Sequence, residues 1–244
     1  MIGRMTKKRV PGVDDARAWN ERLDWAYHLI SADPAERAVA LDRLDRARAK
    51  TQAAIAHYNA VWSAANRFGP HPRKRIAARK AFEETASRSL PEALWTRFGH
   101  GDLRRWPGLP YAVLYLEWEA RYPEQWTRHA KMWGVKQALI RQLATADHDA
   151  GTRAKLVDLV DLVVRRAYRC KDREYVRVAR AVDGPDLRAR LTAARHSPDP
   201  WAQLHAAYVL WLLDHPETPN TRHVWKTWLN ENAPAPHRRH GSGA

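Results

Sequence analysis

The stretch that decides the fold class is DPAERAVALDRLDRARAKTQAAIAHYNAVWSAANRFGP, residues 33–70. Asp33 is a residue type that caps helices, Pro34 suits the first helical position, and Glu36 stands where a capping box has its carboxylate. Gly69-Pro70 is a strong helix stop. The stretch therefore predicts one long helix that ends at about residue 68.

This long helix carries a seam with alternating spacings of three and four residues. The seam positions are 41, 44, 48, 51, 55, 58, 62 and 65, occupied by Leu, Leu, Arg, Thr, Ile, Tyr, Trp and Ala. Arg48 and Thr51 interrupt an otherwise apolar row, which weakens the pattern expected of a coiled coil. We therefore expect an antiparallel hairpin with a first helix over residues 14–30, and a dimeric coiled coil is the alternative.

Helix signals continue through the rest of the chain, and no stretch alternates as a strand does. Several X-Pro steps, such as Asp199-Pro200, begin a predicted helix, because proline in the first turn loses no hydrogen bond. The further predicted helices are 72–88, 90–98, 109–121, 123–145, 152–170, 172–182, 184–196, 199–214 and 218–231. The sequence thus predicts an all-α protein, in which the N-terminal hairpin precedes a multi-helix bundle or a short HEAT-like array of paired helices.

Composition divides the chain into five segments. Residues 1–12 are predicted to be a basic flexible arm, and residues 233–244 a disordered tail. Residues 13–99 form the N-terminal helical region and residues 111–232 the C-terminal helical-pair region. Residues 100–110 hold two Gly and two Pro, which predicts a linker between the two regions.

Cysteine usage and hydropathy bear on the compartment. Cys170 is the only cysteine, so an intrachain disulfide and a cysteine-based zinc site are both excluded. The longest apolar run, residues 206–213, is far shorter than the roughly 20 residues of a membrane-spanning helix. We therefore expect a cytoplasmic protein with no transmembrane segment, and no motif for a metal or a cofactor is found.

The formal net charge of +15 predicts an anionic partner, and nucleic acid is the commonest one. The whole surplus falls in residues 1–10, 69–90, 149–196 and 233–244. The candidate phosphate contacts are Arg73, Lys74, Arg75, Arg79 and Lys80 in one cluster, and Arg165, Arg166, Arg169, Lys171 and Arg173 in another. Ordinary solvated surface is the alternative for both clusters.

The chain is rich in tryptophan, with 12 residues. Packing in the core explains aromatic residues at helical spacing. Trp201 is different, because it follows Pro200 at a predicted helix start, and we expect it to be the most exposed tryptophan. The alternative for the aromatic residues of this chain is that rings beside arginine stack on unpaired bases.

Asp158-Leu159-Val160-Asp161 resembles part of the W-D-x-V-D signature of HEAT-like alkylpurine DNA glycosylases. The resemblance implies that Asp161 would assist the departure of a cationic base and that Trp201 would stack near it. Val157 stands where the family has tryptophan, and the arginine pair that follows the second family tryptophan is absent. The alternative role for Asp161 is an ion pair with Arg165, four residues further along a helix.

Three functions follow from these patterns. The charge favours a non-enzymatic nucleic-acid-binding protein, for DNA or RNA, that grips the phosphate backbone. A helical scaffold or assembly component, including a homo-oligomer, is the first alternative. A glycosylase-type enzyme, with Asp161 and Trp201 as its catalytic candidates, is the second.

Overall fold

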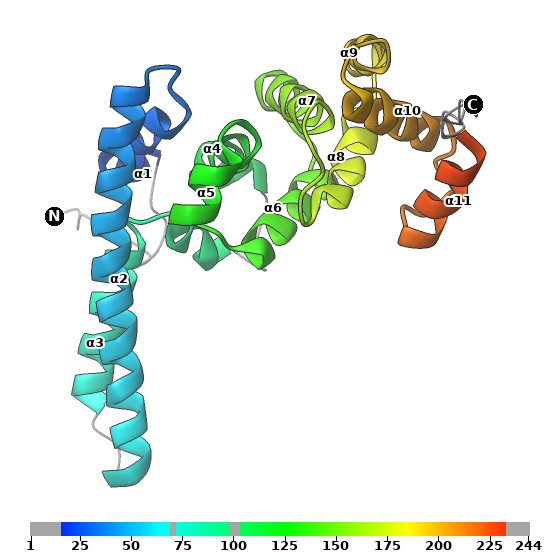
Figure 1. Cartoon of the computed structure of the whole chain (residues 1–244). Coiled ribbons are helices and arrows are strands. Elements are labelled where there is room, and N and C mark those ends of the chain that lie inside the picture. Colours follow the sequence, from blue (N-terminus) through cyan, green and yellow to red (C-terminus); the bar gives the residue numbers. More distant parts are fainter. Residues whose placement is uncertain (1–15, 69–71, 98–102, 233–244) are drawn as a thin grey trace, which may run out of the picture. The chain divides into compact units, whose positions relative to one another are not determined.

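The computed structural model describes residues 16–68, 72–97 and 103–232, so the predicted arm and tail lie outside the described residues. Within those ranges every regular element is a helix and none is a strand, which confirms the all-α class (Figure 1). The chain divides into two compact units, Met1–Val135 (unit 1) and Lys136–Ala244 (unit 2).

Unit 1 is built around the long helix that the sequence predicts. Its elements, where η marks a 3-10 helix, are α1 (Ala16–Leu23), η1 (Asp24–Ile30), α2 (Pro34–Phe68), α3 (Pro72–Ala86), η2 (Glu92–Arg97), η3 (Leu103–Arg105), α4 (Leu109–Arg121) and α5 (Pro123–His129). Asp33 caps α2, since its Oδ1 accepts the Ala35 N–H at 2.8 Å. Glu36 does not complete a capping box but accepts the Ser31 hydroxyl at 2.7 Å.

The middle of the α2 seam is covered from within unit 1, and its two polar members have partners there. Leu44 and Thr51 are fully buried. Arg48 donates to the buried carboxylate of Glu92 at 3.1 Å and to the carbonyl of His129. The polar residues that weakened the coiled-coil pattern therefore serve contacts inside the unit.

The main partner of α2 is α3 rather than the first helix. The two run antiparallel, because the Tyr58 ring lies 6.2 Å from that of Phe82 while Arg75, seven residues earlier in α3, covers Trp62. The predicted helix over residues 14–30 becomes a 3-10 helix after Leu23, and this part, η1, packs on α2.

The division between the units falls after Val135 and not at the predicted linker, residues 100–110. Trp106 and Tyr111 pack on α1: the Trp19 and Trp106 rings are 5.6 Å apart, and the Tyr111 hydroxyl donates to Asn20 Oδ1 at 2.9 Å. Pro107 and Gly108 therefore lie in a turn inside unit 1, between Trp106 and Tyr111, whose rings both pack against Trp19 of α1.

The predicted helix 123–145 is two helices, α5 and α6 (Trp133–Thr145). At the break, side chains from elsewhere in unit 1 satisfy backbone carbonyls. Arg48 donates to the His129 carbonyl, and the buried Tyr115 hydroxyl donates to the Ala130 carbonyl at 2.9 Å. Tertiary hydrogen bonds thus replace helical ones at this break. No local sequence pattern predicts the break.

Unit 2 is a packed group of short helices. Its elements after α6 are α7 (Ala150–Val164), η4 (Asp172–Glu174), α8 (Tyr175–Ala181), α9 (Pro185–Arg195), α10 (Pro200–Asp214) and α11 (Arg222–Asn232). Helix α10 packs against α7, α8 and α9, and α7 also packs against α9 (Figure 1). These contacts fit a multi-helix bundle, and the HEAT-like pairing stays a prediction.

Helix α7 ends at Val164, well before its predicted end at residue 170. The segment that follows is held by one carboxylate. Asp172 accepts the Arg169 N–H at 2.6 Å and the Arg166 guanidinium at 2.8 Å. This turn, together with α10, positions the candidate site.

Candidate functional site

The first predicted basic cluster lies on α3, and most of it is exposed. The exposed members are Arg73, Lys74, Arg79 and Lys80. Arg79 forms an ion pair with Glu83 at 2.7 Å. Arg73, Lys74 and Lys80 form no ion pair with another residue of the described ranges. Arg75 is half-buried, and its guanidinium lies 3.3 Å from the centroid of the Trp62 ring.

The second predicted cluster is dispersed by the fold. Arg165 forms an ion pair with Asp161 at 2.8 Å. Arg166 pairs with the buried carboxylate of Asp172 at 2.8 Å, and only 14% of its side chain is exposed. These two guanidinium groups are committed to contacts within unit 2. Arg166 in particular acts as a structural residue.

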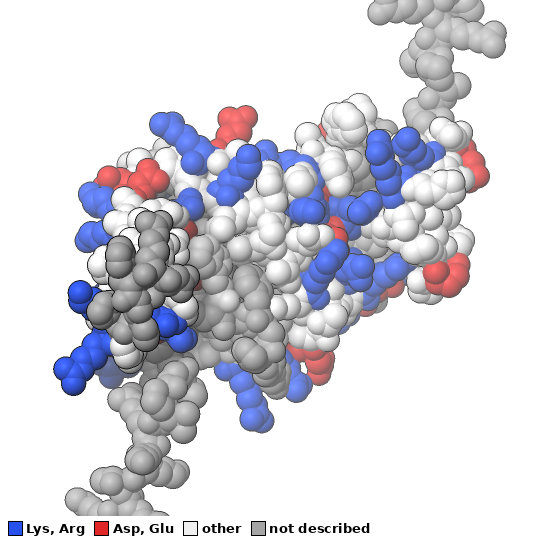
Figure 2. Space-filling model, turned by 90° about the horizontal axis from the view of Figure 1, so that it is seen from below, with Lys and Arg blue, Asp and Glu red and all other residues white. Residues whose placement is uncertain are grey.

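Carboxylates also take up much of the remaining charge of unit 2. Arg177 pairs with Glu174, Arg188 with Asp183 and Asp214, and Arg190 with Asp158 and Asp186. The other members of the predicted cluster differ in exposure: Arg173 is exposed, whereas Arg169 and Lys171 are half-buried. Lys171 and Arg173 form no ion pair with another described residue. On the face drawn in Figure 2, Lys and Arg side chains are widely spread and Asp and Glu lie beside some of them.

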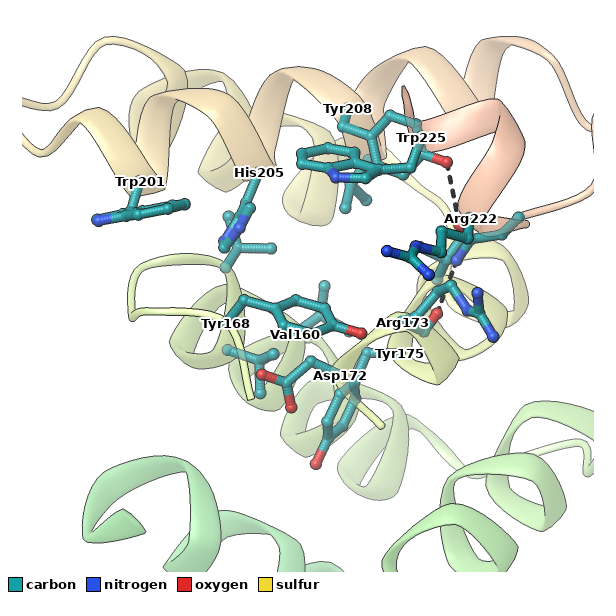
Figure 3. A pocket seen from close by; sticks show the side chains of 15 residues that line it. Val160, Tyr168, Asp172, Arg173, Tyr175, Trp201, His205, Tyr208, Arg222 and Trp225 are labelled. Atoms are coloured by element: carbon teal, nitrogen blue, oxygen red, sulfur yellow. Dashed lines mark hydrogen bonds between the residues drawn. The ribbon is translucent and has the colours of Figure 1, made fainter. Parts of the chain in front are cut away.

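Unit 2 contains a cavity of about 480 Å³ whose walls are largely aromatic and aliphatic (Figure 3). This volume falls within the range of about 300–1,000 Å³ that is typical of small-ligand sites. Its lining comprises Val160, Val163 and Val164 of α7, Tyr168, Asp172 and Arg173 of the following turn, Tyr175 and Val176 of α8, Trp201, His205, Tyr208 and Val209 of α10, Asn220, and Arg222 and Trp225 of α11.

Helix α10 supplies one wall because its lining residues repeat with helical spacing. Trp201, His205 and Tyr208 lie at i, i+4 and i+7, which places them on one face. The Trp201 and His205 rings are 5.8 Å apart, and the Tyr208 ring is 4.6 Å from that of Trp225. This spacing is visible in the sequence, but Trp201 alone among the three was predicted to be a site residue, from its place at a helix start.

Trp201 is the most exposed of the tryptophans, at 53%, which confirms the prediction made for it. Its position follows from the helix start: Asp199 caps α10 by accepting the Trp201 N–H at 2.9 Å, and Pro200 occupies the first turn. The indole therefore lies at the beginning of the helix, where the preceding turn does not cover it.

The opposite wall is fixed by a buried ionic cluster around Asp172. Lys136 is fully buried, and its ammonium donates to Asp172 Oδ1 at 2.6 Å. The same carboxylate also accepts from Arg166 and from the Arg169 N–H. The negative charge in this wall of the cavity is thus compensated by two cations.

At one end of the cavity, Asn220 links two of its walls. Its side-chain carbonyl accepts the Tyr208 hydroxyl at 3.0 Å, and its amide donates to the Arg173 carbonyl at 2.7 Å. Arg173 and Arg222 are exposed at this end, while Trp201 and His205 lie at the other (Figure 3). The cavity therefore has one cationic end, and aromatic rings line it from Trp201 to Trp225.

Burial favours the uncharged forms of His205, Tyr168 and Tyr208 in the cavity. It lowers the pKa of His205 below its usual value, so the imidazole is neutral at pH 7. Burial also raises the pKa of Tyr168, and it raises that of Tyr208 to about 12. The formal charges that line the cavity are those of Asp172, Arg173 and Arg222.

The structure separates the two catalytic candidates. Trp201 lines the cavity, whereas Asp161 pairs with Arg165 on α7 and is not among the lining residues. The arrangement that the glycosylase resemblance implies, with this carboxylate beside this indole in one pocket, is therefore not formed. No group of three His, Cys, Asp or Glu side chains suited to a metal ion occurs in the described ranges.

A second cavity, of about 620 Å³, lies in unit 1. Its lining residues are Asn20, Glu21, Asp24, Trp25, His28, Glu36, Val39, Ala40 and Arg43. Three carboxylates line it, so it does not suit an anionic ligand. The cavity of unit 2 is the better candidate for a partner that the positive charge would attract.

Comparison of the chain with protein-family models, with curated proteins and with solved structures finds no match. None of the described helices combines the length and the apolar character needed to cross a membrane.

Proposed function

We propose that this protein binds nucleic acid without acting on it chemically, and that exposed Arg and Lys side chains hold the phosphate backbone. The observation that carries the proposal is the contrast between two kinds of cation. Carboxylates neutralise Arg165, Arg166 and Arg188, whereas Arg73 and Lys74 on α3 are exposed with no ion-pair partner among the described residues.

Helix chemistry supports this interpretation. Arg73 and Lys74 stand in the first turn of α3, where the helix dipole disfavours cations. They therefore do not stabilise the helix that bears them. An external anion would compensate the positive charge of both side chains. Lys80, further along α3, and Arg173 in unit 2 are exposed in the same way.

Two observations disfavour the alternatives. The α2 seam, which would be the contact surface of a coiled-coil assembly, has Leu44 and Thr51 fully buried inside unit 1. The carboxylate of Asp161, which a base-excising enzyme would need free, is engaged by Arg165. Binding without catalysis uses neither of these groups.

The test compares two triple variants that lower the net charge equally. One is Arg73→Gln, Lys74→Gln and Lys80→Gln on α3. The control is Arg17→Gln, Arg46→Gln and Arg121→Gln, three exposed arginines that already pair with carboxylates four residues away. Affinity for a fluorescent single-stranded 20-mer and for its duplex is measured by anisotropy over a series of salt concentrations.

We expect the α3 variant to bind both forms more weakly and to reduce the slope of log affinity against log salt by about 2, because each lost phosphate contact removes about 0.7 to 0.9 of slope. The control variant should retain most of the slope. Equal losses in the two variants would show that bulk charge, and not α3, attracts the polyanion. Absence of wild-type binding to either form at low salt would contradict the proposed function itself.

A further inference from the structure

We propose that the cavity of unit 2 receives one unstacked base of a single-stranded nucleic acid, with the base against Trp201 and the adjoining phosphate at Arg173 and Arg222. This inference rests on the proposed function and names the form of nucleic acid that the protein prefers. It concerns a cavity that contains none of the α3 residues.

The first support is the chemistry of the walls. A nucleobase is flat and stacks on aromatic side chains whatever its identity. Trp201 offers a ring that is 53% exposed, with the His205 ring 5.8 Å away, and the valines of α7 form an aliphatic floor. A cavity of about 480 Å³ has room for one nucleotide and not for a base pair with its neighbours.

The second support is the distribution of charge along the cavity. Trp201 and His205 lie at one end and two exposed guanidinium groups at the other, where the Tyr208 and Trp225 rings lie beside Arg222 (Figure 3). A nucleotide has the same polarity, with an uncharged base and an anionic phosphate. Arginine guanidinium is well suited to phosphate, because its N–H groups match the oxygen geometry.

The charge distribution also distinguishes this ligand from a cationic one. Aromatic cages with a carboxylate bind quaternary ammonium groups, and Asp172 lines this cavity. Here, however, the Asp172 carboxylate already accepts from Lys136 at 2.6 Å and from Arg166 at 2.8 Å. A cation would gain little from Asp172 and would be repelled by Arg173 and Arg222.

The third support is that the site is preorganised. Asn220 ties Tyr208 on α10 to the Arg173 carbonyl, so the cationic end is held relative to the aromatic wall. The turn that carries Tyr168 is fixed by the buried ionic cluster of Asp172. Binding of a ligand in such a cavity therefore carries little entropic cost for ordering its walls. Bases of an intact duplex are stacked and paired, so only an unpaired base can enter.

The decisive variant is Trp201→Ala, with Trp201→Phe as the variant that keeps an aromatic ring. Because Trp201 is exposed at the start of α10, neither change should unfold unit 2, and thermal melting checks this. Three labelled probes of equal length are used: a single-stranded oligothymidylate, a duplex, and a strand whose sites are all abasic.

We expect Trp201→Ala to weaken binding of the oligothymidylate at least fivefold, in line with the stacking of one base. Trp201→Phe should restore most of this loss, and binding of the duplex and of the abasic strand should not change. Equal binding of the oligothymidylate by wild type and Trp201→Ala would overturn the inference while leaving the proposed function in place. Failure of the wild-type protein to bind any of the three probes would contradict both the inference and the proposed function.

A second pair of variants tests the phosphate end. Arg173→Gln with Arg222→Gln should weaken the oligothymidylate complex more than the control pair, Lys155→Gln with Arg195→Gln, which are exposed in unit 2 outside the cavity. Equal effects would contradict a phosphate site at this end. Displacement of the oligonucleotide by micromolar thymidine monophosphate would identify a free nucleotide as the ligand and overturn the inference. If the wild-type protein dimerises and Trp201→Ala does not, the cavity binds a second copy of this chain, which would also overturn the inference.

Discussion

Tyr208 donates its hydroxyl to the side-chain carbonyl of Asn220 at 3.0 Å, which joins α10 to the segment before α11. Asn220 in turn holds the Arg173 carbonyl at 2.7 Å. The hydroxyl belongs to a side chain that is 6% exposed, and burial raises its pKa to about 12. One amide therefore fixes the cationic end of the cavity against its aromatic wall.

Asn220→Ala should destabilise unit 2 by about 1–3 kcal/mol, because it leaves the Tyr208 hydroxyl buried without its acceptor. Tyr208→Phe should cost less, about 0.5–1.5 kcal/mol, since it removes the hydroxyl itself. Urea unfolding of both single variants and the double variant measures the coupling. Strictly additive effects would show that this hydrogen bond contributes nothing to stability.

Lys136→Met should destabilise unit 2 by about 3 kcal/mol, because it removes one partner of a buried ion pair. Asp172→Asn should cost more, since the carboxylate accepts from Lys136, Arg166 and the Arg169 N–H. Denaturant unfolding followed by tryptophan fluorescence gives both values. A loss below about 1 kcal/mol in both variants would mean that the turn between α7 and η4 is held by other contacts.

Acid should weaken unit 2 through Glu174. The guanidinium of Arg141, with help from Gln137 and Arg177, lowers the pKa of this carboxyl from 4.5 to about 2. A lowered pKa contributes stability that is complete above the pKa of the unfolded chain and is lost as pH falls toward the folded value. The free energy of unfolding should therefore fall between about pH 4.5 and 2.

The matched variant for this pH dependence is Glu174→Gln, which cannot ionise. Unfolding midpoints measured in steps from pH 6 to pH 2 should decline less steeply in this variant than in wild type. Parallel curves would show that other carboxylates account for the acid sensitivity.

Gly108→Ala should destabilise unit 1 by about 1–3 kcal/mol through overpacking. A Cβ at this position would lie 2.5 Å from Trp106 Cε2 and 2.6 Å from Trp19 Cη2, both on large rings. Gly134→Ala is the control, because its Cβ would meet nothing within 4 Å, and in a helix the change should stabilise by up to about 1 kcal/mol. Thermal melting distinguishes the two, and a neutral Gly108→Ala would contradict the tight packing of these rings.

Local signals in the sequence determined that the chain is helical and where α2 and α10 begin. Asp33 and Pro34 begin α2, Asp199 and Pro200 begin α10, and both starts lie where these residues predict them. Capping and proline geometry act within one turn of helix, so a single sequence contains them in full. The exposure of Trp201 followed from the same local argument.

Only the tertiary structure decided where helices stop without a stop signal and which charges remain available. Carbonyls at the α5–α6 break are satisfied by Arg48 and Tyr115, and α7 ends early because Asp172 gathers Arg166 and Arg169. Arg166 is not available on the surface because it pairs with Asp172. Trp201 and Arg222 line the same cavity although they lie far apart in the chain. Such pairings depend on the packing free energy of a whole unit, and local sequence signals cannot predict it.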